Sequence, residues 1–393
     1  MSAFAELLSL SERDKQSRGV LHTPAEIAQQ PSSWQKTFAL FENKHPEIVE
    51  FLGATGLDAS DPRDRPTVFL IGAGTSDYIG QSLAILLRQQ WQCEVQAVPS
   101  TDLLTQLEEI SLRHKKYLWI SFSRSGDSPE GVEVLQRARR FRPDIYQLVI
   151  SCNANGKMVH DHAADPHVLS VCLDDAVNDR GLAMTSSFSN MVIFGQCLAH
   201  FKQLEHYEKV LNRLVEAGNE FLPVAANCAS VLAKESFNKA CFVGSGSLRA
   251  AAKECSLKLL EMTAGRIITM SESALGLRHG PMAALDENTL FVCFLSSIEP
   301  VQAYERALLR EIKNKKLVST RVAVWAAPGS ARKSVAEYDL IVSEHEFVAD
   351  EYRPVLDVIF GQMLGLFFSI RSGLQPDCPS PNGAISRVVQ SVV

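Results

Sequence analysis

One strand–turn–helix pattern occurs twice in the chain, and this repeat limits the folds that it can adopt. The first copy is an apolar run, a glycine turn at Gly72–Ser76 and a helical stretch to Arg88. The second starts at Cys241, turns at Gly244–Ser247 and continues as a helix to Glu261. Short β-rich runs alternate with helices after each copy, which indicates parallel sheets of the doubly wound kind. We therefore expect an α/β protein with two tandem doubly wound parallel-sheet domains.

The remaining strands are expected in the same order after each glycine turn. They are expected at residues 93–98, 117–122, 147–151 and 167–173, and then at 267–270, 290–295, 321–326 and 338–342. The predicted parts are a helical N-terminal arm (1–48), a first domain (49–205), a helical connector (206–235), a second domain (236–372) and an extended C-terminal tail (373–393). In the arm, Thr23-Pro24-Ala25-Glu26 is predicted to form a capping box with Pro24 at the first helical position.

Composition narrows the class of protein. The 393 residues are enough for two full cores, and a hydrophobic share of 46% with 21% charged residues is typical of globular chains. The net charge of -6, without a dominant basic stretch, argues against nucleic acid as the main partner. Nine cysteines without a C-x-x-C pair indicate reduced thiols in a cytoplasmic protein.

No membrane segment or secretory signal is expected. The apolar run at residues 355–370 is interrupted by Asp357, Gln362 and two glycines, so we interpret it as a core helix and not a membrane span. The first residues, 1–14, are polar and acidic after a short apolar patch, unlike a signal peptide.

The segment Ser123-Arg124-Ser125-Gly126-Asp127-Ser128 follows the predicted strand 117–122. It leads into a helix with Ser128 as the expected N-cap and Pro129 at the first helical position. Backbone N–H groups at a helix N-terminus, hydroxyl donors and the Arg124 guanidinium together favour bound phosphate. An ordinary polar turn remains the alternative, because Ser and Gly are common in turns of every kind.

Two other ligand classes are less well supported. Gly72-x-Gly74 begins a dinucleotide fingerprint, but its third glycine would fall at Asp77, whose charge would repel a pyrophosphate. The segment His160–His167 holds metal-ligand residue types, yet we interpret it as a surface segment that leads into a strand. We therefore expect no cofactor and no metal.

Taken together, the two glycine turns, the S-x-S-G-x-S loop and Arg278-His279-Gly280-Pro281 resemble the sugar isomerase (SIS) domain family. The nearest likeness is to its branch of galactosamine-6-phosphate deaminase/isomerases, also called tagatose-6-phosphate ketose/aldose isomerases. Residues 26–31, 182–188 and 386–390 carry that likeness. The resemblance covers nearly the whole chain.

The resemblance implies the residues of a sugar-phosphate site. Glu261 matches the base that moves the C2 proton, with Glu254 and Glu272 as rival candidates. His279 matches the histidine that opens the sugar ring, and in the family it reaches across from a partner subunit, which implies a homodimer with shared active sites. The implied phosphate- and sugar-binding residues are Gly74, Thr75, Ser76, Ser123, Arg124, Ser125, Ser128, Leu182, Ser386 and Arg387.

The chain departs from the family pattern at two of these positions. The family often has Gln where Arg124 stands. Its aminating synthase has an essential lysine in the tail, where this chain has Ser386, so imine chemistry at that lysine is not carried over.

The reaction implied by the resemblance is the deaminating isomerisation of D-galactosamine 6-phosphate to D-tagatose 6-phosphate and ammonia. A single carboxylate can move the proton from C2 to C1 without a metal, and water then hydrolyses the resulting ketimine. The segment before Val68 is too short for a glutaminase domain, so release of ammonia is the expected direction.

Three alternatives remain open: a glucosamine-6-phosphate deaminase, a plain phosphosugar aldose/ketose isomerase and a non-catalytic sugar-phosphate sensor. Sensors that act on DNA carry a basic helix-turn-helix, and residues 1–51 have little net positive charge, which disfavours that class.

Overall fold

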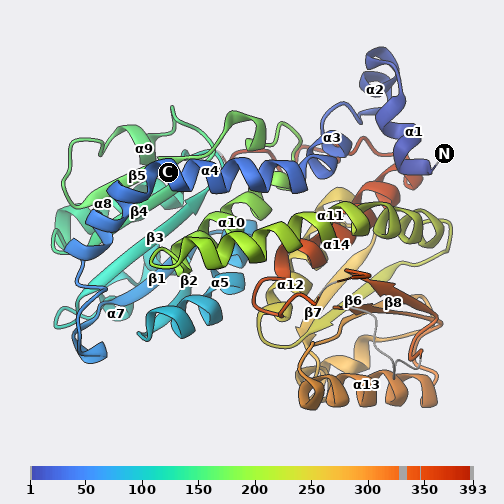
Figure 1. Cartoon of the computed structure of the whole chain (residues 1–393). Helices are drawn as coiled ribbons and strands as arrows, with labels where there is room; N and C mark the ends of the chain where they lie inside the picture. The colour runs from blue at the N-terminus through green and yellow to red at the C-terminus, as the bar shows by residue number, and fades with distance from the viewer. Residues whose placement is uncertain (1, 327–333, 346, 390–393) are drawn as a thin grey trace. The chain divides into compact units, whose positions relative to one another are not determined.

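The structure is a computed structural model that describes residues 2–326, 334–345 and 347–389. Its strands form two five-stranded sheets in which all neighbouring strands are parallel (Figure 1). The predicted α/β class with two parallel sheets is thereby confirmed, and each predicted strand is present with ends shifted by a few residues. The chain divides into two compact units: unit 1 comprises residues 1–32, 179–185 and 210–386, and unit 2 comprises residues 33–178, 186–209 and 387–393.

The sheet of unit 2 has the strand order β2-β1-β3-β4-β5. Its strands are β1 (Thr67–Gly72), β2 (Val95–Pro99), β3 (Tyr117–Ser123), β4 (Tyr146–Ser151) and β5 (Val168–Cys172). Because β2 lies on one side of β1 and β3 on the other, the winding direction changes between β1 and β3. Loops that leave a parallel sheet at such a switch point diverge and create a binding crevice.

Buried apolar side chains hold unit 2 together. β1 and β3 are buried along their whole length, as expected for strands covered by helices on both faces. Phe69 and Trp119 stack with ring centroids 6.1 Å apart and pack against Val134 and Ala138 of α8 (Pro129–Phe141). The helices and short turns of this part are η1 (Pro62–Asp64), α5 (Thr75–Trp91), α6 (Ser100–Thr105), α7 (Leu107–Ile110), α8 (Pro129–Phe141), α9 (Lys157–His160), η2 (Asp175–Val177) and α10 (Ser186–Ala199).

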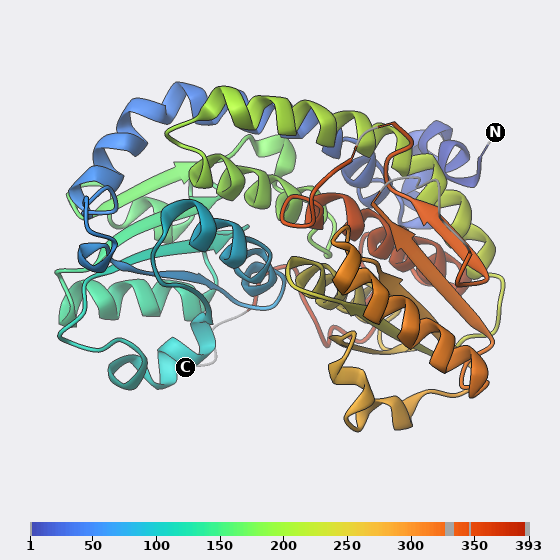
Figure 2. The ribbon, with the colours of Figure 1, turned by 60° about the horizontal axis from the view of Figure 1, so that its bottom comes forward.

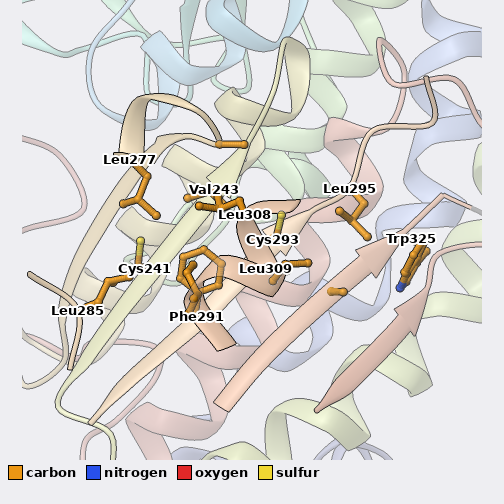
Figure 3. Packing of buried hydrophobic residues seen from close by; sticks show 13 residues of the cluster. Cys241, Val243, Leu277, Leu285, Phe291, Cys293, Leu295, Leu308, Leu309 and Trp325 are labelled. Atoms are coloured by element: carbon orange, nitrogen blue, oxygen red, sulfur yellow. The ribbon is translucent and has the colours of Figure 1, made fainter. Parts of the chain in front are cut away.

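The sheet of unit 1 repeats this topology with the order β7-β6-β8-β9-β10. Its strands are β6 (Lys239–Gly244), β7 (Ile268–Ser273), β8 (Thr289–Phe294), β9 (Thr320–Trp325) and β10 (Tyr338–Ile341). Alternate side chains of neighbouring strands, such as Cys241 and Phe291, pack against Leu308 and Leu309 of α13 (Glu299–Asn314) (Figure 3). Figure 2 shows α13 lying over the strands of this sheet. The shared strand order supports the interpretation of the chain as an internal repeat.

The opposite face of this sheet is covered by α12 (Ser247–Met262), which packs on α14 (Pro354–Arg371). Gly361 and Gly365 of α14 have no side chain, and this lets Cys255 and Met262 of α12 approach the helix closely. Within the described residues, α14 is the one helix long and apolar enough to cross a membrane, but 89% of it is buried inside the protein. It is a core helix, as predicted.

The N-terminal arm differs from its prediction at the third helix. The arm contains α1 (Ala3–Ser9), α2 (Glu12–Arg18), α3 (Thr23–Ala28) and α4 (Gln30–Ala54), and the connector is α11 (Leu204–Leu232). The predicted capping box is wrong, because the N-cap of α3 is His22. The Thr23 N–H group donates to the Asp377 carboxylate over 2.8 Å, and the Glu26 carboxylate accepts from Arg180 and Gly181. Acceptors and donors from elsewhere in unit 1 replace the local pair.

Candidate functional site

The first glycine turn of unit 2 lies at the switch point between β1 and β3. Gly74 is the N-cap of α5 and has a φ angle of +57°, a conformation that favours glycine. Thr75 and Ser76 follow in the first turn of the helix and are both buried, each with 6% of its surface exposed. The register pairs Ile71 with Ser121, so this turn and the end of β3 leave the sheet at the same edge. The predicted residues of the two loops therefore come from neighbouring strand ends.

The loop after β3 is fixed by its own hydroxyl groups. Ser123 Oγ accepts the Gly126 N–H over 3.0 Å, and Ser125 Oγ accepts the Asp127 N–H over 3.2 Å. Gly126 has a φ angle of +66°, and a Cβ atom there would lie only 3.1 Å from the Gly156 Cα atom. These hydrogen bonds and the close approach of Gly126 to Gly156 fix the course of the loop.

The helix that follows this loop supplies a positive end. α8 begins at Pro129 with Ser128 as its N-cap, as predicted, although the Ser128 hydroxyl makes no capping hydrogen bond. The partial positive charge of a helix N-terminus attracts anions. The acidic neighbour Asp127 is tied to the adjacent loop, where its carboxylate accepts the Lys157 N–H over 3.0 Å. These features fit a phosphate pocket.

Arg124 has a partner in the C-terminal tail. Its side chain is buried, and Nη2 donates to the carbonyl oxygen of Arg387 over 2.6 Å. The Arg387 guanidinium in turn donates to Asn178 Oδ1 over 2.6 Å. The structure therefore brings together two of the predicted residues, Arg124 and Arg387. Ser386, the residue before Arg387, is exposed.

Helix α12 of unit 1 carries a buried charged cluster of Glu254, Lys258 and Glu261. Lys258 is fully buried, its ammonium lies 3.3 Å from Glu254 Oε1, and it also contacts Glu261 Oε1. Burial alone would lower the pKa of Lys258, but the attraction of the two carboxylates outweighs it, so the pKa is raised and the ammonium is kept. Glu261 retains a 16% exposed side chain. A carboxylate held by an ammonium, yet open to solvent, suits a proton carrier.

His279 lies in an exposed turn of unit 1 that follows β7, between the short helices η3 (Gly276–Arg278) and η4 (Pro281–Ala284). Its backbone N–H donates to the Gly276 carbonyl over 3.0 Å. The preceding Arg278 places Nε 2.9 Å from Glu311 Oε2 of α13, which ties the turn to a core helix. The imidazole thus stands on an anchored turn.

Leu182 belongs to a segment of unit 1 whose backbone is held on both sides. Its N–H donates to the Asp377 carbonyl over 2.9 Å, and the Gly181 N–H donates to Glu26 Oε1 over 3.2 Å. Asp179, at the start of the segment, accepts the Thr185 N–H over 2.8 Å. Burial, reinforced by the charge of Asp179, raises the pKa of Glu26 to about 8.

The second repeat has the corresponding loop after β8, but the chain's own carboxylates occupy its donors. Asp350 accepts from the Ser296 hydroxyl over 2.5 Å and from the Ser297 N–H over 2.8 Å. Glu305 accepts the Ser296 N–H over 2.6 Å, and burial raises its pKa to about 7. The Ser296 and Ser297 donors of this loop are therefore bound within unit 1, and the loop of unit 2 is the candidate for phosphate.

Sequence reasoning missed part of this arrangement. The i, i+4, i+7 spacing of Glu254, Lys258 and Glu261 placed them on one face of a helix, and it was the available signal for the cluster. No sequence signal pointed to Asn178 as the partner of Arg387. His160 ends the short helix α9 before β5, and among the residues described no group of three or more His, Cys, Asp or Glu is placed to hold a metal.

Comparison with known proteins gives relatives over the whole length. No family model matches the chain. A Streptomyces coelicolor protein with the provisional name D-galactosamine-6-phosphate deaminase AgaS is 34% identical over 374 residues, 95% of this chain and 94% of the relative. The D-galactosamine-6-phosphate deaminase AgaS of Escherichia coli O157:H7 is 31% identical over 382 residues, 94% of each chain. A crystal structure from Clostridium novyi NT, provisionally described as a tagatose-6-phosphate ketose/aldose isomerase, matches with a TM-score of 0.91 and 28% identity over 98% of each chain.

Proposed function

The chain belongs to the sugar isomerase (SIS) domain family, in the branch of the galactosamine-6-phosphate deaminases, and on this premise we propose that it converts D-galactosamine 6-phosphate and water to D-tagatose 6-phosphate and ammonia. The chain is an enzyme, because the relatives that it matches over their whole length have the names of enzymes. The observation that carries the choice of reaction is the whole-length similarity to two relatives named as deaminases, at 34% and 31% identity. The sensor alternative is set aside for the same reason.

The phosphate of the substrate is proposed to bind at the two loops of unit 2. Its donors would be backbone and hydroxyl groups of Gly74–Ser76 and of Ser123, Ser125 and Ser128. Neutral donors at a helix N-terminus hold a dianion without a cofactor. The sugar is proposed to contact the backbone at Leu182 and the tail at Ser386 and Arg387.

Glu261 is proposed to act as the base on the opened sugar. Its carboxylate takes the C2 proton, and the electron pair of the C2–H bond forms the C1=C2 bond of an enolamine while the aldehyde oxygen O1 gains a proton. The same carboxyl returns a proton to C1 as the nitrogen forms a double bond to C2. The nitrogen then releases one proton, which balances the proton taken up by O1, and a ketimine remains at C2. Water adds to this ketimine, the C–N bond breaks, and ammonia leaves with the ketose behind. Lys258 holds the Glu261 carboxylate in place through the ion pair between them.

His279 is proposed to move the proton to or from the ring oxygen when the sugar opens, because imidazole exchanges protons near neutral pH. We also propose that the protein is a cytoplasmic homodimer with active sites shared between subunits. The exposed position of His279 is compatible with a role toward a second subunit.

The proposal is tested by incubating the pure protein with D-galactosamine 6-phosphate and measuring ammonia and ketose. Equal amounts of both products are expected, with slower turnover of glucosamine 6-phosphate. Faster turnover of glucosamine 6-phosphate than of D-galactosamine 6-phosphate would identify glucosamine 6-phosphate as the substrate instead.

Plain aldose/ketose isomerisation is the second candidate, favoured by the isomerase name of the Clostridium novyi structure. It uses the same proton transfer on a substrate without the amine. Interconversion of a phosphosugar aldose and ketose, with no ammonia from either amino sugar, would establish it in place of deamination.

A further inference from the structure

The contact between Arg124 and Arg387 links the phosphate loop to a residue 263 positions away in the sequence, and both residues lie in unit 2. Arg124 is 6% exposed, so its guanidinium reaches the tail from a buried position. A charged donor at 2.6 Å from a carbonyl oxygen makes one of the stronger hydrogen bonds in proteins.

Arg387 is held at its side chain as well as at its carbonyl. Its Nη2 donates to Asn178 Oδ1 over 2.6 Å and lies 3.4 Å from the Asn178 carbonyl oxygen. Asn178 is itself 7% exposed and follows η2. The tail residue is therefore fixed at two points on unit 2, one on the phosphate loop and one on the segment after β5.

We propose that Arg124 is a positioning residue that holds the tail segment Arg387–Val389 against the phosphate-binding loop. Its guanidinium acts through the Arg387 carbonyl, so the loop and the tail become one wall of the phosphate pocket. This role rests on the proposed function of the loop as the phosphate site. The long side chain of arginine lets a buried residue reach this backbone carbonyl.

The clamp has a direct chemical reporter, because trypsin cleaves the peptide bond whose carbonyl Arg124 holds. Cleavage after Arg387 requires the Arg387 side chain and that carbonyl to enter the protease, which cannot happen while Asn178 and Arg124 bind them. When release and rebinding of the tail are fast compared with cleavage, the cleavage rate is therefore proportional to the fraction of molecules whose tail is released.

Limited trypsin digestion of the full chain, followed by intact mass, tests the clamp. The Arg124→Met variant, which keeps the length of the side chain and removes its donors, is expected to lose residues 388–393 about tenfold faster or more than the parent. The Asn178→Ala variant is expected to do the same, and it keeps the test valid if Arg124→Met fails to fold. Arg140→Met, on the exposed last turn of α8, is the matched control and should cleave at the parent rate. Unchanged cleavage after Arg387 in the folded variants would overturn the proposal.

A kinetic cycle separates positioning from direct contact with the substrate. Arg124→Met and deletion of residues 387–393 are each expected to raise the KM for galactosamine 6-phosphate several-fold. The double variant should be no worse than the deletion alone, because without the tail Arg124 has no Arg387 carbonyl to hold. Multiplied effects would show that Arg124 touches the phosphate itself and would overturn the positioning role. Absence of turnover in the parent would overturn the proposed function, whereas the trypsin comparison would still decide the clamp.

Discussion

Glu254 Oε1 lies 3.3 Å from the ammonium nitrogen of Lys258, and both side chains are almost completely withdrawn from solvent. Glu261 contacts the same ammonium from the next turn of α12. The two carboxylates depend on this buried cation, because removing it leaves Glu254 buried without a compensating charge and Glu261 without its partner. The cluster thus links the stability of unit 1 to the position of the proposed base.

Lys258→Met is expected to destabilise the protein by about 3–5 kcal/mol, the usual cost of breaking a buried ion pair from one side. It should also lower kcat, because Glu261 loses the ion pair that holds its carboxylate in place. Urea unfolding gives the free energy of unfolding, and ammonia release gives kcat.

The matched control is Lys315→Met at the C-cap of α13, where Lys315 Nζ lies 2.7 Å from Glu311 Oε1 at the surface. That exposed pair should contribute less than about 1 kcal/mol. Equal losses of stability in the two variants would contradict the assigned importance of burial.

Glu261→Gln is expected to reduce kcat by about 10²–10⁴-fold, the range for loss of a general base. Its affinity for inorganic phosphate should stay at the parent value, since the proposed phosphate donors lie in the loops of unit 2. Steady-state kinetics with phosphate as a competitive inhibitor measures both quantities.

Glu272→Gln is the control for the rival assignment. Glu272 lies on the edge strand β7 with Oε2 3.6 Å from Arg249 Nη2, and its substitution should leave kcat unchanged. A large loss in Glu272→Gln together with an active Glu261→Gln would transfer the role of the base to Glu272.

The fold was predictable because its signals are local. The glycine turns at Gly74 and Gly246 each follow an apolar run, and each stands at the N-cap of a helix in the structure. Ser128 was likewise recognisable as an N-cap from the Pro129 that follows it. Such patterns need no knowledge of distant residues.

The contacts that define the candidate site could not be predicted in this way, because they join residues that are far apart in the sequence. Arg124 bonds to a residue 263 positions away, and Glu26 bonds to Arg180 at a separation of 154. The capping box failed for this reason: its side chains found partners that only the folded chain supplies. A local hydrogen-bonded motif does not form when buried groups from distant parts of the chain bond to the same residues instead.

Gly126→Ala is expected to weaken binding of inorganic phosphate at least about tenfold. A Cβ atom would lie 3.1 Å from Gly156 Cα and 3.2 Å from Ser151 Oγ, so the loop must shift. The left-handed φ of +66° adds a conformational cost of about 1 kcal/mol. Phosphate titration by calorimetry measures the change.

Gly56→Ala separates the two causes. Gly56 has a φ of +79°, and no atom lies within 4 Å of the position that a Cβ would occupy, so alanine there meets the conformational cost alone. It should lose stability and keep phosphate affinity. Equal phosphate affinity in both variants would argue against the loop as the binding site.

Glu26 should make stability depend on pH. Burial, reinforced by the charge of Asp179, raises the pKa of its carboxyl from an ordinary 4.5 to about 8. The folded protein therefore holds a proton that the unfolded chain releases between these values, and stability falls as the pH rises from about 5 to 8.

Glu26→Gln keeps an oxygen acceptor for the Arg180 and Gly181 N–H groups and removes the titration. The unfolding free energy of the variant minus that of the parent is the quantity to compare. This difference should be on the order of 2–4 kcal/mol larger at pH 9 than at pH 5. Denaturant unfolding at both pH values, with Glu12→Gln on the exposed helix α2 as control, measures the difference. A parent-to-variant difference that is the same at both pH values would show that Glu26 is already ionised in the folded protein at pH 5. In that case the two backbone N–H donors, which lower the pKa, outweigh burial at this carboxyl.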